Sequence, residues 1–248
     1  MKKVITDAGF HIATEAFPDA RTFRYSLDAG EINMDVKAAI ENGDSATLRR
    51  LLSERPSRAN ELIRWGKCLT HPLHYISDML FSGTLQRGKE VPLVDALIEA
   101  GSDLNFNKDG KSETPLIGAA SLGGEDVGLR LLDAGARPEL RGLFGETALH
   151  WAALLGEDRL VARLIPGSDL NLKDEKYNSP PLGWAIHGWS DPPAGNCGRQ
   201  GDVVACLVAA GAKFEPEWLE DEKVRANPAF RKVRDELRAY LKKFPQSD

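Results

Sequence analysis

The sequence has few cysteines, no long apolar run and no strong excess of one charge. Cys68, Cys197 and Cys206 are too few and too widely spaced for a disulfide framework, so we expect reduced thiols. No apolar run approaches the roughly 20 residues that cross a bilayer, and the apolar residues after Lys2 and Lys3 are too few for a signal peptide. We therefore expect no membrane association and a cytoplasmic location.

The charge balance also argues against a nucleic-acid partner. Lysine and arginine total 32 against 37 aspartate and glutamate residues, which leaves a net charge of −5 and no broad positive field for a phosphate backbone. Hydrophobic residues make up 42% of the 248 residues, which is enough to bury a sizeable core. We expect a folded protein.

A repeat with a period of about 33 residues is the main feature that is present. Leu116, Leu149 and Leu182 are separated by this same interval. Small residues follow each of these leucines, at Ala119-Ala120, Ala152-Ala153 and Ala185. Few architectures have this period, and small residues at these positions let one helix approach its neighbours closely. The pattern predicts the first helix of a repeating unit.

A second helix is predicted near the end of each unit. A hydrophobic doublet precedes a glycine, and an earlier pair of positions completes an i, i+1, i+4, i+5 set on one helix face. The glycine stands where a helix ends. The doublets and their glycines are Leu97-Ile98 with Gly101, Leu131-Leu132 with Gly135, Leu164-Ile165 with Gly167, and Leu207-Val208 with Gly211.

These residues resemble the ankyrin repeat, whose pattern is Gly-x-Thr-Pro-Leu-His-x-Ala-Ala, a turn with glycine, an Ile-Val-x-x-Leu-Leu helix and Gly-Ala-Asp-x-Asn. Residues 145–171 match it almost throughout, and residues 101–105 and 167–171 repeat its closing signature. With a weaker match at residues 71–74, the resemblance covers roughly residues 34 to 215. Neither helix of one unit can bury its apolar stripe until the next unit stacks on it, which supports the resemblance independently.

The resemblance implies an all-α solenoid of about five helix-turn-helix units over residues 34–215. Residues 1–33 form an N-terminal extension, and residues 216–248 contain a C-terminal capping helix that begins after Asn227-Pro228. Unit two, near residues 79–90, and unit five, at residues 188–201, carry about nine and ten extra residues. Both insertions fall where the first helix joins the second, so they should project from one edge and flank a groove.

The resemblance also implies that partners bind to the concave face, which is formed by the finger before each inner helix and by the inner helices. Trp151 and Trp184 are separated by one repeat period, which places them side by side in units four and five. Aromatic side chains are favoured at the centre of binding surfaces. An alternative interpretation is that both tryptophans fill the core. The candidate partner-binding residues are Leu143, Phe144, Glu146, Trp151, Leu155, Tyr177, Trp184, His187 and Glu113.

No catalytic residue, metal site or cofactor is predicted. In the ankyrin pattern the imidazole at His150 links the finger to the helix start, and His187, Cys197 and Cys206 lack the spacing of metal ligands. We therefore expect a non-catalytic scaffold or regulatory subunit that binds a partner protein. The alternative is an enzyme or small-molecule binder whose pocket is formed by the inserted loops of units two and five, because long loops are often functional.

Overall fold

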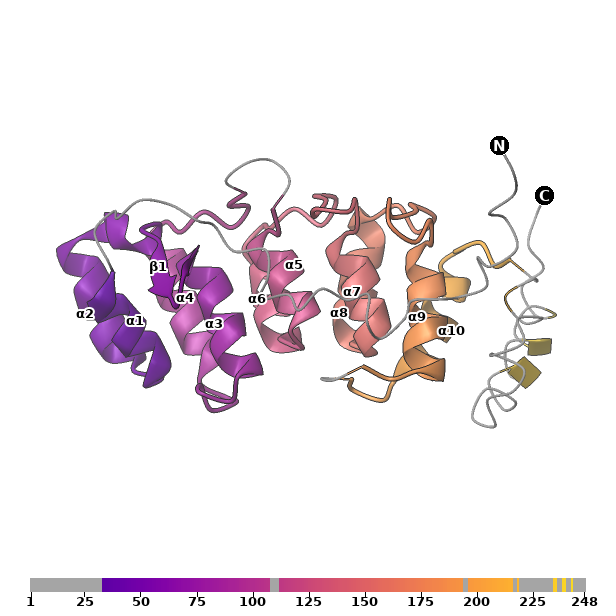
Figure 1. The fold of residues 1–248 in the computed structure, drawn as a ribbon, viewed down its shortest axis with the longest axis horizontal. Coiled ribbons are helices and arrows are strands. Elements are labelled where there is room, and N and C mark those ends of the chain that lie inside the picture. Colours follow the sequence, from indigo (N-terminus) through magenta and orange to yellow (C-terminus); the bar gives the residue numbers. More distant parts are fainter. Residues whose placement is uncertain are drawn as a thin grey trace.

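Pairs of short helices stack in a row along the chain (Figure 1). The structure is a computed structural model that describes residues 33–107, 112–193 and 196–215, together with Trp218 and five separate positions after it. Ten α-helices lie within these residues. They are α1 (Met34–Glu41), α2 (Ser45–Glu54), α3 (Pro72–Phe81), α4 (Glu90–Glu99), α5 (Pro115–Ser121), α6 (Glu125–Asp133), α7 (Ala148–Leu155), α8 (Asp158–Leu164), α9 (Pro181–Ser190) and α10 (Gln200–Ala209).

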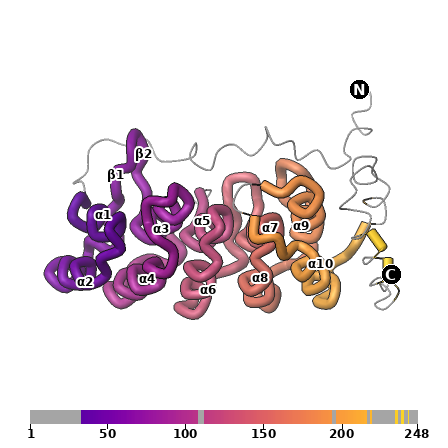
Figure 2. The backbone as a smooth tube through the Cα atoms, turned by 90° about the horizontal axis from the view of Figure 1, so that it is seen from below, coloured from indigo at the N-terminus to yellow at the C-terminus, as the bar shows by residue number. Residues whose placement is uncertain are grey.

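The helices form two layers, and each layer runs the length of the array (Figure 2). The inner helices α1, α3, α5, α7 and α9 contact one another in that order, and the outer helices α2, α4, α6, α8 and α10 do the same. Units one to five are the successive pairs α1/α2 to α9/α10. This arrangement confirms the all-α solenoid predicted from the repeat.

A small hairpin that the sequence analysis missed precedes α3. Strands β1 (Ile63–Trp65) and β2 (Cys68–Thr70) pair antiparallel, with Ile63 opposite Thr70. Gly66 between the strands has φ of 60°, which glycine adopts without strain. Each strand has only three residues, too few for an alternating pattern to be visible in the sequence.

Repeated aliphatic residues form a core that continues from unit to unit. Leu116, Leu149 and Leu182 on the inner helices are each at most 1% exposed. The outer helices bury a matching stripe, and burying such a side chain contributes roughly 1.5–3 kcal/mol. Its fully buried members on α6, α8 and α10 are Val127, Leu131, Leu160, Val161, Leu164, Val203 and Leu207.

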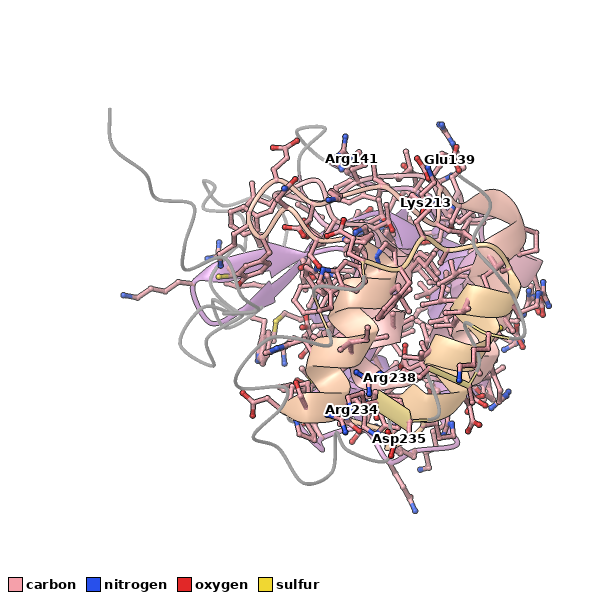
Figure 3. The ribbon with its side chains drawn as sticks, turned by 90° about the vertical axis from the view of Figure 1, so that its right-hand side faces the viewer. Glu139, Arg141, Lys213, Arg234, Asp235 and Arg238 are labelled. Atoms are coloured by element: carbon pink, nitrogen blue, oxygen red, sulfur yellow. The ribbon has the colours of Figure 1, made fainter. Side chains whose placement is uncertain are left out.

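Asparagine side chains join the fingers of neighbouring units. Each accepts a hydrogen bond on Oδ1 from a backbone N–H of the next unit, so the polar group is satisfied where two units meet. The three pairs are Asn60 with Asp103 at 2.7 Å, Asn105 with Arg137 at 2.9 Å, and Asn171 with Lys213 at 2.7 Å. Figure 3 shows Lys213 and Glu139 along the upper edge of the molecule.

The two insertions lengthen the inner helices before they form loops. Helices α3 and α9 have 10 residues each, whereas α5 has 7 and α7 has 8. Both long connections lie along the lower edge in Figure 1. Arg87 Nη1 donates to the Gly123 carbonyl at 3.2 Å, and Arg199 Nη2 donates to Glu125 at 2.9 Å. The loops are therefore anchored to the turns between them and brace this edge, rather than standing apart as the two walls of a groove.

Two predicted segments lie at the ends of the chain. Residues 1–32 of the expected N-terminal extension lie outside the described residues, as does the C-terminal capping helix except for five separate positions. Among the described helices, none is both long and apolar enough to cross a membrane.

Replacing Gly188 with alanine should destabilise the protein by about 1–3 kcal/mol, because a Cβ there would lie 2.0 Å from the backbone oxygen of Leu154. A backbone atom cannot move aside without displacing α7 from α9. Gly201→Ala in α10 is the matched control, since its nearest contact is the Trp189 ring at 3.3 Å. Urea unfolding of both variants tests this, and equal stabilities would contradict it.

Position 139 lacks the asparagine found at the equivalent positions 105 and 171, and the Glu139 carboxylate pairs instead with Arg137 at 2.7 Å. Glu139→Asn should add an acceptor for the Asp169 N–H and raise the free energy of unfolding by about 0.5–1.5 kcal/mol. Glu139→Gln is the control, because it also removes the charge but has a longer side chain. An equal gain in the free energy of unfolding in both variants would show that loss of the Glu139 charge causes the effect.

Candidate functional site

The finger of unit four is a tight turn that projects two apolar residues. Gly142 N donates to the Glu146 carbonyl at 2.7 Å, and Gly145 has φ of 75°, in the left-handed region. The Glu146 carboxylate accepts a hydrogen bond from Phe144 N at 2.8 Å, which fixes the backbone of the finger tip. Burial raises the pKa of Glu146, and hydrogen bonds from the Glu146 and Phe144 backbone oppose that rise. Leu143 and Phe144 are half-buried at the tip.

The finger of unit five is organised by the buried carboxylate of Asp174. Its Oδ1 accepts from the backbone N–H groups of Lys176 at 2.9 Å and Tyr177 at 2.6 Å. Its Oδ2 accepts from the Trp184 indole Nε1 at 3.0 Å. Asn178 has φ of 51° and stands one repeat period after Gly145, so an asparagine supplies the left-handed turn here. Together these contacts make the finger a preorganised loop.

Trp184 lies at the centre of an aromatic cluster beneath the two fingers. Its ring is 5.1 Å from Trp151, 5.4 Å from His150 and 5.9 Å from Tyr177, each in edge-to-face geometry. Trp184 is 2% exposed, whereas Trp151 is half-buried. The two tryptophans are side by side as predicted, but for Trp184 the alternative interpretation as core holds. Its indole supports the finger through Asp174 and presents no surface to a partner.

Three other candidate residues are also buried in the structure. Leu155 and Glu146 are each 3% exposed, and His187 is 5% exposed. Burial lowers the pKa of His187 and Asp191 opposes this, so a neutral imidazole is favoured. Direct contact between these side chains and a partner is therefore corrected to a supporting position. The candidates that remain half-buried at the surface are Leu143, Phe144, Trp151, Tyr177 and Glu113.

Lys176 is a member of the finger surface that the sequence analysis missed. Its Nζ lies 5.1 Å from the Phe144 ring centre and 5.0 Å from that of Tyr177. Glu175 N donates to the Phe144 carbonyl at 2.6 Å, which brings the two fingers together. The cation therefore lies between two aromatic rings from adjacent units. Its neighbour Tyr177 was a candidate, but only the finger-to-finger contact shows that Lys176 reaches both rings.

His150 has a structural place in the fold. Its Nδ1 accepts from Thr147 N at 3.1 Å, so the proton is on Nε2, which donates to the Leu172 carbonyl of the next finger at 3.0 Å. His74 at the equivalent position lies 3.9 Å from Glu113 Oε2. Among the described residues, no group of three or more His, Cys, Asp or Glu is placed to hold a metal ion.

Comparison with known proteins finds the same repeat. A family model described as ankyrin repeats (3 copies) matches residues 80–188, from the end of α3 through most of α9. The chain is 43% identical over 70 residues to Dauer abnormal formation protein 25 of Caenorhabditis elegans, covering 28% of this chain and 18% of that protein. It is 36% identical over 74 residues to 2-5A-dependent ribonuclease of Homo sapiens, covering 30% and 10%. The matches span less than a fifth of either relative.

The contribution of His150 to the stability of the fold should fall as the pH drops from about 6.5 to about 4. Burial lowers the pKa of His150 to about 4, so unfolded His150 binds a proton across this range while folded His150 does not. His150 therefore contributes a loss of about 1.4 kcal/mol per pH unit below its unfolded pKa. His71, whose pKa burial lowers to about 3, adds to the same trend.

Urea unfolding of wild type and His150→Gln at several pH values isolates this contribution. The variant should be less stable at neutral pH, because it loses the bond to Leu172, but its stability should fall less steeply with acid. Equal slopes would contradict the assignment of a buried neutral imidazole. His74→Gln serves as a control, since its ring lies in a more exposed setting.

Proposed function

Since this chain is an ankyrin-repeat protein, we propose that it is a protein-interaction module that binds a partner protein through the fingers and inner helices of units four and five. Ankyrin repeats generally mediate protein-protein interaction, which supports the coarse part of this proposal. The partner surface consists of Leu143, Phe144, Tyr177 and Lys176, with Trp151 and Glu113 at its rim.

The observation that carries the proposal is the pair of aromatic rings on adjacent finger tips. Phe144 and Tyr177 remain half-buried, while their backbone N–H groups donate to the carboxylates of Glu146 and Asp174 beneath them. Rigid, partly exposed aromatic side chains lose little conformational entropy when a partner covers them, which is why hot spots favour them. Lys176 between the rings adds a positive charge beside these two aromatic tips.

We propose that the chain is non-catalytic and acts as a scaffold or regulatory subunit in the cytoplasm. The alternative pocket between the inserted loops has less support, because Arg87 and Arg199 tie those loops to the turns of unit three. The name of the human relative denotes a ribonuclease, but the match covers a tenth of that protein, so we do not extend the activity to this chain. The repeat domain is proposed to span residues 34–215, between the extension at 1–33 and the C-terminal segment at 216–248.

The test is a double substitution, Phe144→Asp with Tyr177→Asp, in affinity purification from the native host. Each aspartate places a charge in the centre of the proposed contact, and two hot-spot losses of about 1–2 kcal/mol each should weaken binding by roughly 30-fold or more. Trp184 is left intact, since a charge at a side chain that is 2% exposed would disrupt folding.

Ala162→Asp is the control, because Ala162 is exposed on α8 and the substitution introduces one aspartate on the outer layer of unit four. This variant should retain every partner that wild type retains. Partners kept by the double variant would refute the finger surface. Equal loss from both variants would show that added charge, rather than position, reduces binding.

A further inference from the structure

A buried carboxylate without hydrogen bonds lies at the turn between α7 and α8, on the edge opposite the fingers. Glu157 is 0% exposed, and within the described residues neither Oε1 nor Oε2 has a hydrogen-bond partner. It occupies the N-cap position of α8, where a side chain often accepts from the first N–H groups of the helix. Those groups are taken, because Glu125 Oε1 accepts from Arg159 N at 3.0 Å. Burying an unpartnered carboxylate is costly, so this site needs an explanation.

The cover over Glu157 comes from the insertion of unit five. We call residues 196–200 the latch segment. Cys197 N donates to the Leu155 carbonyl at 2.7 Å, and Gln200 Nε2 donates to the Leu154 carbonyl at 3.1 Å. A Cβ on Gly156 would lie 3.0 Å from the Arg199 backbone nitrogen, so the segment passes directly over the turn. The latch segment therefore closes off the α7–α8 turn from solvent.

Arg199 ties the latch segment to two other units. Its guanidinium donates to Asp158 through Nε and to Glu125 Oε2 through Nη2 at 2.9 Å, and the second contact spans 74 residues of sequence. These two carboxylates satisfy Arg199, which leaves Glu157 without a direct cation. The latch segment is held by hydrogen bonds to α7 and ion pairs to α6 and α8, and none of them uses Glu157.

Charges of both signs surround the Glu157 carboxyl. Burial raises its pKa well above the ordinary value, Glu125 and Asp126 on α6 reinforce the rise, and Arg199 and Arg87 oppose it. Arg159, the remaining cation at this turn, pairs with Asp126 at 3.0 Å. Cys197 is a further titratable group here, and burial raises the pKa of its thiol, with Glu157 adding to the rise. The closed arrangement therefore accommodates Glu157 as a neutral acid.

We propose that residues 196–200 form a proton-dependent latch, which is closed over the α7–α8 turn while Glu157 is protonated and opens when Glu157 ionises. An ionised carboxylate without partners regains its hydration only if the latch segment lifts. Opening breaks the Cys197–Leu155 and Gln200–Leu154 hydrogen bonds and exposes the turn and the Cys197 thiol. The device is independent of the finger surface and of the partner that binds there.

The sign of the pH dependence follows from the raised pKa. The closed state binds a proton that the open state, with an ordinary carboxyl, releases at lower pH. Closure is therefore fully favoured below the ordinary pKa of a glutamate and is lost progressively as the pH rises. The equilibrium constant for opening should rise up to tenfold per pH unit until the pH passes the pKa of the closed state.

Amide hydrogen exchange of Cys197, measured by NMR from about pH 5 to about pH 9 and corrected for intrinsic rates, tests the latch. In wild type the protection factor should fall by up to tenfold per pH unit over the range below the pKa of the closed state. In Glu157→Gln, which keeps the shape and stays neutral, it should stay constant. Glu99→Gln on the exposed end of α4 is the matched control and should follow wild type.

The Cys197→Ser variant distinguishes the effect of the Glu157 carboxyl from that of the Cys197 thiol. Its protection factor should keep the wild-type pH dependence. A protection factor in wild type that does not change with pH overturns the proposal without any variant. A pH dependence that persists in Glu157→Gln also overturns it, and one that disappears in Cys197→Ser would assign the effect to the thiol. Failure of the latch leaves the proposed partner surface untouched, since none of these residues lies on the fingers.

Discussion

The whole structure depends on the inability of one helix pair to cover its own apolar faces. Leu116, Leu149 and Leu182 are almost completely buried only because the inner helix of a neighbouring unit packs on each of them. Each unit therefore contributes stability mainly through its neighbours. The array grows in one direction, and polar groups at each junction must find partners in the next unit.

The fingers show how those polar groups are satisfied. Asn60, Asn105 and Asn171 accept hydrogen bonds from backbone N–H groups across the junctions. His150 donates a hydrogen bond to the Leu172 carbonyl of the following finger. The Asp174 carboxylate accepts hydrogen bonds from backbone N–H groups of its own finger and from the indole N–H of Trp184. Because the buried groups are bonded in this way, the aromatic tips above them are held in place. A rigid base with aromatic tips is the arrangement that suits a binding surface.

The edge opposite the fingers is held mainly by contacts of the two insertions. There the inserted residues of units two and five extend α3 and α9 and then return to the intervening turns through Arg87 and Arg199. Arg199 forms ion pairs here with Asp158 and Glu125, whereas Glu157 is buried without a hydrogen-bond partner among the described residues. The two proposed roles therefore fall on opposite edges, with partner binding at the fingers and a conformational response at the Glu157 turn.

The sequence by itself determined the repeat, the helices of each unit, the ankyrin family and the place of both insertions, because the repeat period and its glycines are local features that each unit carries. It also placed Trp151 beside Trp184 and His150 in a structural position. It did not determine which of these side chains are exposed, since the burial of Trp184, Leu155, Glu146 and His187 depends on the tertiary packing around them. Only the tertiary structure decided that Lys176 reaches two rings and that a distant loop buries Glu157, because both contacts join residues that no local pattern relates.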